Sequence, residues 1–181
     1  MKKTSIPALL LMLSVTAAAQ EAKTPKEVEG TTVKTVVIRD TQNNPLPLPE
    51  FGKKNLLIFY VDPDHYKQNE EFVDYLTKNP VEGPTLRGYG VTNLKDAPLL
   101  PNSVLRAVMR SKQKSTGAAI YTDPDHSLRD GWNLGDCNNK FVVLLVSRNG
   151  VIDFFRYGDF TEQDKKDFFR VIEKYRAEEK K

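Results

Sequence analysis

The sequence predicts an α/β domain built on a mixed β-sheet, with helices between parallel strands and a β-hairpin plus a terminal helix at its C-terminal end. Two uninterrupted apolar runs, residues 56–61 and 141–146, have the composition of strands covered on both faces. Helical periodicity follows the first run, and an Asn-Gly hairpin signal at 149–150 follows the second. The chain therefore combines a parallel unit with an antiparallel one.

The first residues have the pattern of a cleaved secretory signal. Two lysines precede the apolar stretch 6–15, and three alanines at 17–19 offer an Ala-x-Ala cleavage site. Neither this stretch nor any later one has the roughly 18 to 20 apolar residues that cross a bilayer. We therefore expect residues 1–19 to be a signal peptide, the location to be periplasmic, and no stable membrane insertion.

The polar residues 20–31 have no periodic apolar pattern and are predicted to form a flexible N-terminal segment ahead of a domain at 32–181. The whole chain of 181 residues carries a formal net charge of +3, which loss of the signal's two lysines would bring closer to zero. A near-neutral protein lacks the strongly basic surface of nucleic-acid binders, so nucleic acid is not expected as a partner. The single cysteine, Cys137, excludes an internal disulfide.

In the first half of the domain, residues 35–39 read as a strand, and prolines at 45, 47 and 49 favour an extended segment over a helix. The run 56–61 should be a central strand. Asp62 and Pro63 then supply an N-cap and a first-turn proline for a helix that reaches about residue 79. This part of the chain is a strand that leads into a helix.

Strand and helix patterns continue to alternate in the second half of the domain. We predict a parallel strand at 86–94, a helix at 102–112, a short strand at 118–122 and an antiparallel partner strand at 151–157, joined to 141–146 by a type I′ turn. A capping box at 161–164 opens the terminal helix. The predicted buried faces of the two helices are Val104, Leu105, Val108 and Met109, and Phe168, Val171, Ile172 and Tyr175.

This order of elements is that of a thioredoxin-like three-layer α/β/α sandwich. The segment from Ile120 through Asp123-Pro124-Asp125-His126 to Trp132, with the hairpin and terminal helix, resembles the YtfJ family of exported thioredoxin-like proteins. The similarity extends over roughly residues 85–175 as a pattern. The resemblance implies a periplasmic thioredoxin fold without a defined biochemical role.

The superfamily places catalytic cysteines just past the central strand, where this chain has Asp62 to Lys67 instead. Asp64 and Lys67 take the approximate cysteine positions, and neither a carboxylate nor an ammonium can form a sulfur bond. Dithiol exchange within one molecule is therefore excluded. The helix N-terminus at the carboxyl end of this strand is still a place where ligands bind in α/β proteins.

Both histidines of the chain lie in the same tetrapeptide, Asp-Pro-Asp-His, at 62–65 and 123–126. Imidazoles and carboxylates are zinc ligands, so Asp62, His65, Asp123 and His126 are candidates for one metal site. Capping explains the same residues, because Asp-Pro-Asp suits the start of a helix and acidic groups stabilise a first turn. We favour capping, since another strand is expected to separate the two turns.

Cys137 lies in a loop that we expect to face the same helix end, near His65 and Lys67. A cationic neighbour would lower the pKa of its thiol, whereas the adjacent Asp136 acts in the opposite direction. A basic helix end at residues 106–114 is interpreted as a solvated face, and the aromatic residues around Trp132 and 154–160 as core.

The sequence therefore favours a non-catalytic binding or accessory protein of the periplasm, with no cofactor. The candidate ligand-binding residues are Asp64, His65, Lys67 and Cys137, and the partner is an unidentified periplasmic protein or small ligand. Two alternatives remain open at this stage. One is a single-cysteine thiol peroxidase or reductase that uses Cys137, and the other is a metal-binding protein that uses the two Asp-Pro-Asp-His turns.

Overall fold

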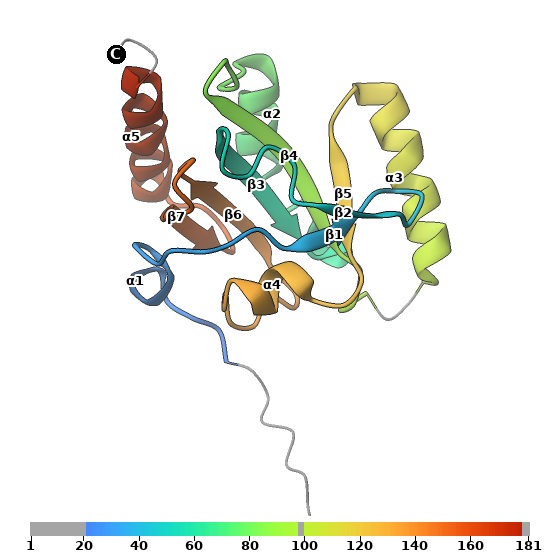
Figure 1. Cartoon of the computed structure of the whole chain (residues 1–181). Coiled ribbons are helices and arrows are strands. Elements are labelled where there is room, and N and C mark those ends of the chain that lie inside the picture. Colours follow the sequence, from blue (N-terminus) through green and yellow to red (C-terminus); the bar gives the residue numbers. More distant parts are fainter. Residues whose placement is uncertain (1–20, 98–99, 179–181) are drawn as a thin grey trace, which may run out of the picture.

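The computed structural model describes residues 21–97 and 100–178, and the predicted signal peptide lies outside these ranges. Seven strands form one sheet in the order β2-β1-β5-β4-β3-β6-β7 (Figure 1). The strands are β1 (Val37–Arg39), β2 (Pro45–Pro47), β3 (Asn55–Val61), β4 (Leu86–Asn93), β5 (Ile120–Asp123), β6 (Phe141–Val146) and β7 (Ile152–Tyr157). The helices are α1 (Pro25–Val28), the 3₁₀ turn η1 (Pro63–His65), α2 (Glu70–Lys78), α3 (Asn102–Thr116), α4 (Ser127–Gly131) and α5 (Glu162–Glu178).

The sheet is mixed, as the sequence predicts. Strands β3, β4 and β5 are parallel neighbours, and β6 pairs antiparallel with both β3 and β7. The predicted extended proline segment pairs with β1 in an antiparallel ribbon at the other edge. None of the helices in the described ranges is long and apolar enough to cross a membrane.

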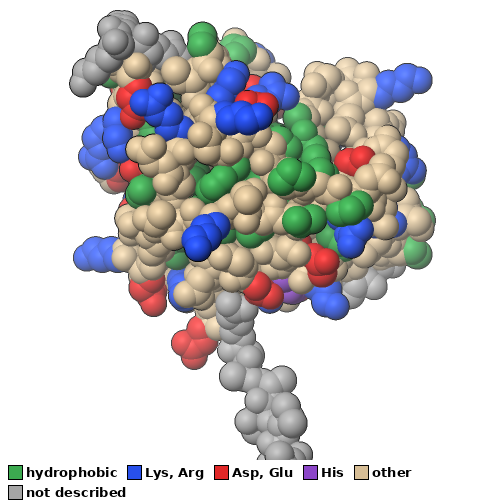
Figure 2. All heavy atoms as spheres, in the orientation of Figure 1, with side chains coloured by type: hydrophobic (Ala, Val, Ile, Leu, Met, Phe, Trp, Pro, Cys, Tyr) green, Lys and Arg blue, Asp and Glu red, His purple; other side chains and the backbone are tan. Residues whose placement is uncertain are grey.

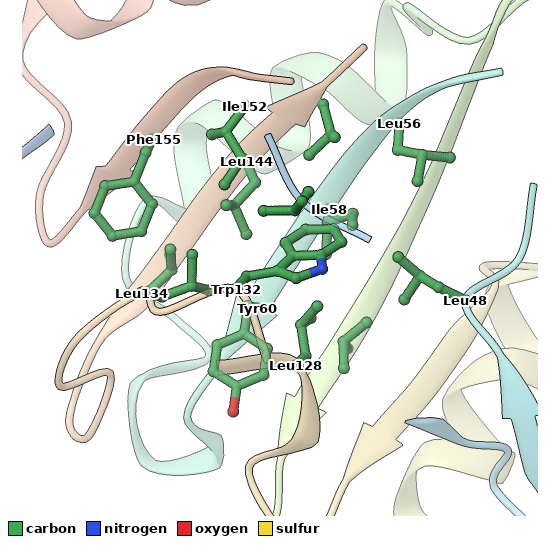
Figure 3. Close-up of a cluster of buried hydrophobic side chains, with 14 of the residues drawn as sticks. Leu48, Leu56, Ile58, Tyr60, Leu128, Trp132, Leu134, Leu144, Ile152 and Phe155 are labelled. Carbon is green, nitrogen blue, oxygen red and sulfur yellow. The ribbon is translucent and has the colours of Figure 1, made fainter. Parts of the chain in front are cut away.

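Alternation along the interior strands divides the core between the two faces of the sheet. Ile58 and Tyr60 of β3 pack with α4 on one face (Figure 3), whereas Leu57 packs with α2 and α5 on the other. Strand β6 alternates in the same way and is buried along its whole length. Helix α3 covers the β5 side of the sheet through a smaller cluster of Leu94, Ala97, Leu105 and Met109.

The predicted terminal helix and its start are confirmed. The backbone N–H of Thr161 donates to the Asp164 carboxylate at 2.9 Å, and the N–H of Asp164 donates to the Thr161 hydroxyl at 3.1 Å, which completes a capping box. Three of the four predicted core residues, Phe168, Ile172 and Tyr175, are fully buried, and Val171 is partly buried against them.

The predicted flexible segment at 20–31 differs from the structure, which describes it from residue 21 on. Val28 is only 2% exposed, on α1, and belongs to the core beside α4. Glu29 pairs with Arg156, and the N–H of Gly30 donates to the carbonyl of Ile152 at 2.8 Å. Between residues 21 and 31 only the Val28 side chain enters the core, while the backbone bonds to β7, which accounts for the polar composition of the segment.

The predicted helix 63–79 is interrupted. The chain makes η1, then a turn, and α2 begins only after Asn69, whose φ of 62° lies in the left-handed region. The Asn69 side chain donates to the carbonyl of Gly158 and accepts from the N–H of Phe160. These bonds to the loop after β7 hold Asn69 in a conformation that a continuous helix cannot contain.

The hairpin turn is not of type I′, which requires a positive φ at both central residues. In the turn from Ser147 to Gly150, only Gly150 has a positive φ, at 78°. A Cβ at Gly150 would lie 2.6 Å from the carbonyl oxygen of Val33, so the close approach of the chain at Val33 also requires glycine here. Ser147 and Val151 close a three-residue loop, and the register of the two strands shifts separately, between Leu145 and Val146.

Candidate functional site at the carboxyl edge of the parallel strands

The three parallel strands end at one edge of the sheet, each with a buried polar residue. Asp62 follows β3, Asn93 ends β4 and Asp123 ends β5, and each is 0% exposed. Buried polar groups must be hydrogen-bonded, so their partners decide what this edge can do. Figure 1 places α4 and the first turn after β3 at this edge.

The carboxylate of Asp62 is used by the backbone on both sides. One oxygen accepts from the N–H of Asp64 at 2.9 Å, which caps η1. The other accepts from the N–H of Asn139 at 2.9 Å and so ties η1 to the loop that precedes β6. Asp62 therefore acts as a helix cap and a loop clamp.

The residues that follow Asp62 lie at the surface. Asp64 and Lys67 are exposed, and Tyr66 between them is 59% exposed. The ammonium of Lys67 lies 5.7 Å from the centroid of the Tyr66 ring, within the range of a cation–π interaction. His65 is half-buried, and its Nδ1 is buried without a hydrogen-bond partner among the described residues. This loop therefore presents an acid, an aromatic ring and a cation to solvent.

Asp123 is bonded in the same manner as Asp62. Its Oδ1 accepts from the N–H of Ser127 at 2.7 Å, and its Oδ2 accepts from the N–H of Leu128 at 3.0 Å and from the hydroxyl of Tyr60 at 3.1 Å. Burial raises the pKa of the Asp123 carboxyl above its usual range, although these hydrogen bonds oppose the shift. The carboxylate thus fixes the start of α4 against β3.

His126 belongs to a group that the sequence analysis did not find. Its Nε2 lies 2.9 Å from the carboxylate of Asp96, and Arg129 lies 3.4 Å from the same nitrogen. All three side chains are nearly buried, between 11% and 15% exposed. Asp96 follows β4, and Asn93 donates to it at 2.6 Å. The sequence does contain a signal for this group. Asp96 comes just after a predicted parallel strand, so its carboxylate should reach the same edge of the sheet as Asp62 and Asp123.

The metal-site candidates do not come together. Strand β4 separates β3 from β5, as expected, so the two turns follow strands that are not neighbours. Within the described ranges, no three His, Cys, Asp or Glu side chains form a group that could hold a metal ion. Asp62 and Asp123 bond to backbone N–H groups, while His126 bonds to Asp96.

Cys137 lies inside the core beneath this edge. Its residue is 1% exposed, and its sulfur lies 3.7 Å from the carbonyl oxygen of Gly135. Burial raises the pKa of the thiol to about 12, against the opposing effect of Lys140 and Arg129. These are the cations that act on the sulfur, whereas the sequence analysis expected His65 and Lys67.

Comparison with solved structures gives the fold. The chain is similar to the thioredoxin domain of a thiol-disulfide oxidoreductase from Bacteroides vulgatus, with a TM-score of 0.53 and 16% identity over 81% of this chain and 96% of that one. The fold is thioredoxin-like. A thiol:disulfide interchange protein from a Bacteroides species has a TM-score of 0.53 and 17% identity over 81% of this chain and 89% of that one.

The thioredoxin-like fold also matches a reduced 2-Cys peroxiredoxin from Plasmodium vivax, with a TM-score of 0.53 and 12% identity over 85% of this chain and 99% of that one. At such identities the likeness concerns the fold alone. No protein-family model and no curated protein matches the chain. The function must therefore be argued from the residues of this site.

Proposed function

We propose that this protein is an exported thioredoxin-fold binding or accessory protein that contacts a periplasmic partner through the loop at 62–67. One observation carries the proposal: the only cysteine is buried in the core, and the loop at the usual cysteine position presents Asp64, Tyr66 and Lys67 to solvent. The scaffold is that of a thiol enzyme, whereas the exposed groups at its edge suit recognition.

The state of Cys137 argues against thiol catalysis. Attack on a disulfide or peroxide requires a thiolate. Because burial raises the pKa of this thiol to about 12, it is almost entirely protonated at pH 7, and the sulfur is covered by neighbouring residues. A single-cysteine peroxidase or reductase would need the opposite environment.

The exposed loop has features of a protein-binding surface. Tyrosine is enriched at interface hot spots because it combines apolar area with a polar tip and few rotatable bonds. Tyr66 is 59% exposed and is flanked by charges of both signs. The buried anchor Asp62 fixes the start of the loop, so a partner would not need to order it.

The first experiment tests whether the protein has thiol activity. Hydrogen peroxide consumption and insulin reduction are followed with residues 20–181, both as the wild type and as Cys137→Ser. Both proteins should match the blank, and iodoacetamide should alkylate native Cys137 at least about 100-fold more slowly than the urea-unfolded chain. Peroxide consumption that the serine variant loses would establish the thiol enzyme instead.

The binding surface is tested by placing a photo-crosslinking amino acid at position 66, with position 75 as the control. Tyr75 is also exposed, at 51%, but lies on α2. We expect a discrete periplasmic adduct from position 66 only, weakened in Asp64→Asn and Lys67→Gln backgrounds. Equal adducts from both positions, or adducts unaffected by the loop variants, would overturn the proposed surface.

A further inference from the structure

Helix α3 exposes residues that the sequence pattern places in the core. Leu105 and Met109 are each 9% exposed and pack against the β5 side of the sheet, as predicted. Val104 and Val108 were predicted to join them, but they are 43% and 60% exposed. Leu100, just before the helix, is 50% exposed. Three aliphatic side chains are therefore exposed on this helix or just before it.

The two valines lie on one line along the helix. Residues four apart stand above one another, one turn apart, so Val104 and Val108 are adjacent on the outward side. Ser111 and Ser115 are exposed and continue the same line, because successive residues turn by about 100°. The outer face of α3 is thus a narrow apolar row that ends in small polar residues.

Every charged side chain of α3 is a cation: Arg106, Arg110, Lys112 and Lys114. By helical geometry, Lys112 lies on one side of the valine row, and Arg110 and Lys114 lie on the other. Arg110 donates to the carbonyl of Thr41, and none of the four forms an ion pair within the described part of the chain. Figure 2 shows basic side chains over α3 on the right-hand side of the molecule.

We propose that the outer face of α3 docks the protein on an anionic lipid surface. An apolar row with cations on both sides matches a membrane interface, where aliphatic groups enter the headgroup region while Lys and Arg contact lipid phosphates. The row lies along the outward side of a single helix. An acidic peptide would pair with the cations but would leave the aliphatic row uncovered, whereas a membrane interface accepts both kinds of side chain.

This docking is peripheral and reversible. Three aliphatic side chains bury little area, so attraction between cations and anionic headgroups must supply much of the affinity, and salt must weaken it. The face does not include the loop at 62–67, so the inference stands independently of the proposed function.

The test is co-sedimentation of residues 20–181 with vesicles made of equal parts phosphatidylglycerol and phosphatidylcholine, and with vesicles of phosphatidylcholine alone. We expect binding only to the anionic vesicles, with a loss at high salt. Both Lys112→Gln/Lys114→Gln and Val104→Ser/Val108→Ser should lower the bound-to-free ratio at least about fivefold. Because all four positions are exposed, circular dichroism should show unchanged thermal unfolding.

Two matched controls separate this face from general surface effects. Lys53→Gln/Lys78→Gln removes the same charge from exposed positions elsewhere, and Val37→Ser changes a valine that is 56% exposed on β1. Both controls should bind like the wild type. The inference is overturned by an absence of binding to anionic vesicles at low salt, or by control variants that lose as much as the α3 variants. Binding of a polyglutamate peptide in place of vesicles would also overturn it and would assign the face to an acidic protein partner.

Discussion

Asp123 joins strand β5 to helix α4 through both of its carboxylate oxygens. Oδ1 accepts from the N–H of Ser127, while Oδ2 accepts from the N–H of Leu128 and the hydroxyl of Tyr60. Because each oxygen has its own donor, an amide cannot replace the carboxylate without turning its NH₂ group toward an N–H. Asp123 therefore has a structural role that its isosteric amide, asparagine, cannot fill.

We predict that Asp123→Asn lowers the free energy of unfolding by about 1–3 kcal/mol, because one buried donor loses its acceptor. Urea unfolding followed by circular dichroism measures the change. Asp64→Asn is the matched control, since it makes the same substitution at the third position of the other Asp-Pro-Asp-His turn, where the side chain is exposed. A similar loss in both variants would show that the buried bonds contribute nothing specific.

The same variant has a predicted pH signature. Burial raises the folded-state pKa of Asp123, so the stability that its protonated form contributes is complete below the unfolded pKa and is lost as pH rises through the folded value. Asparagine does not titrate. The stability gap between wild type and Asp123→Asn should therefore be wider near pH 4 than near pH 7. A gap that is constant, or wider at neutral pH, contradicts the raised pKa.

The sequence pattern identifies residues that cap strands, but not the residues that come to lie beside them. Capping by Asp62 follows from the local Asp-Pro-Asp order, and the structure shows the expected bond. The contact of His126 with Asp96 depends on how the loop after β4 folds back, which no local pattern encodes. Burial of Cys137 was also not predictable, because its loop is polar on both sides of the sulfur.

At the scale of elements, the break before α2 is produced by one side chain. Asn69 donates to the carbonyl of Gly158 at 2.7 Å and accepts from the N–H of Phe160 at 2.8 Å. The left-handed backbone of Asn69 ends the turn after η1. The same conformation allows the side chain to form both bonds. Asparagine combines that conformation with an amide that can donate and accept.

We predict that Asn69→Ala destabilises the fold by about 2–4 kcal/mol, since it loses two hydrogen bonds and places alanine in a left-handed conformation. Asn69→Gly should recover about 1 kcal/mol of this loss, because glycine adopts that backbone without strain. Urea unfolding of both variants gives the comparison. Asn43→Ala, at an exposed residue with a φ of 76°, isolates the cost of the backbone alone. An Asn69→Ala loss no larger than that of Asn43→Ala would exclude a clamping role.

Elements with strong periodicity were predictable, and those set by distant contacts were not. The buried strands β3 and β6 and the helix α5 follow from apolar runs and spacing, and they form the centre of the fold. The valines of α3 fit a helical core pattern equally well, but the helix buries only Leu105 and Met109, one from each turn, against the β5 side of the sheet. A spacing rule identifies a helix without fixing how wide its buried face is.

At the scale of the whole molecule, the N-terminal segment closes the domain. It forms a bridge between Ala22 and Gly135, places Val28 in the core, and pairs Glu29 with Arg156 on β7. Arg156 also pairs with Asp164 of α5, so this one guanidinium connects the N-terminal segment to both β7 and α5. The segment thereby covers the β7 side of the sheet, which would otherwise be an unprotected edge.

This arrangement predicts that Val28→Ala lowers the free energy of unfolding by about 1–3 kcal/mol, through lost burial and a residual cavity. Val37→Ala removes the same atoms from a side chain that is 56% exposed, so its effect should stay within about 0.5 kcal/mol. Urea unfolding of both variants shows whether residues 20–31 are packed against the domain or form a flexible segment. If residues 20–31 were flexible, Val28 would be solvated and the two substitutions would lower the free energy of unfolding by equal, small amounts. A larger loss for Val28→Ala would instead mean that the folded domain begins about ten residues earlier than its apolar pattern indicates.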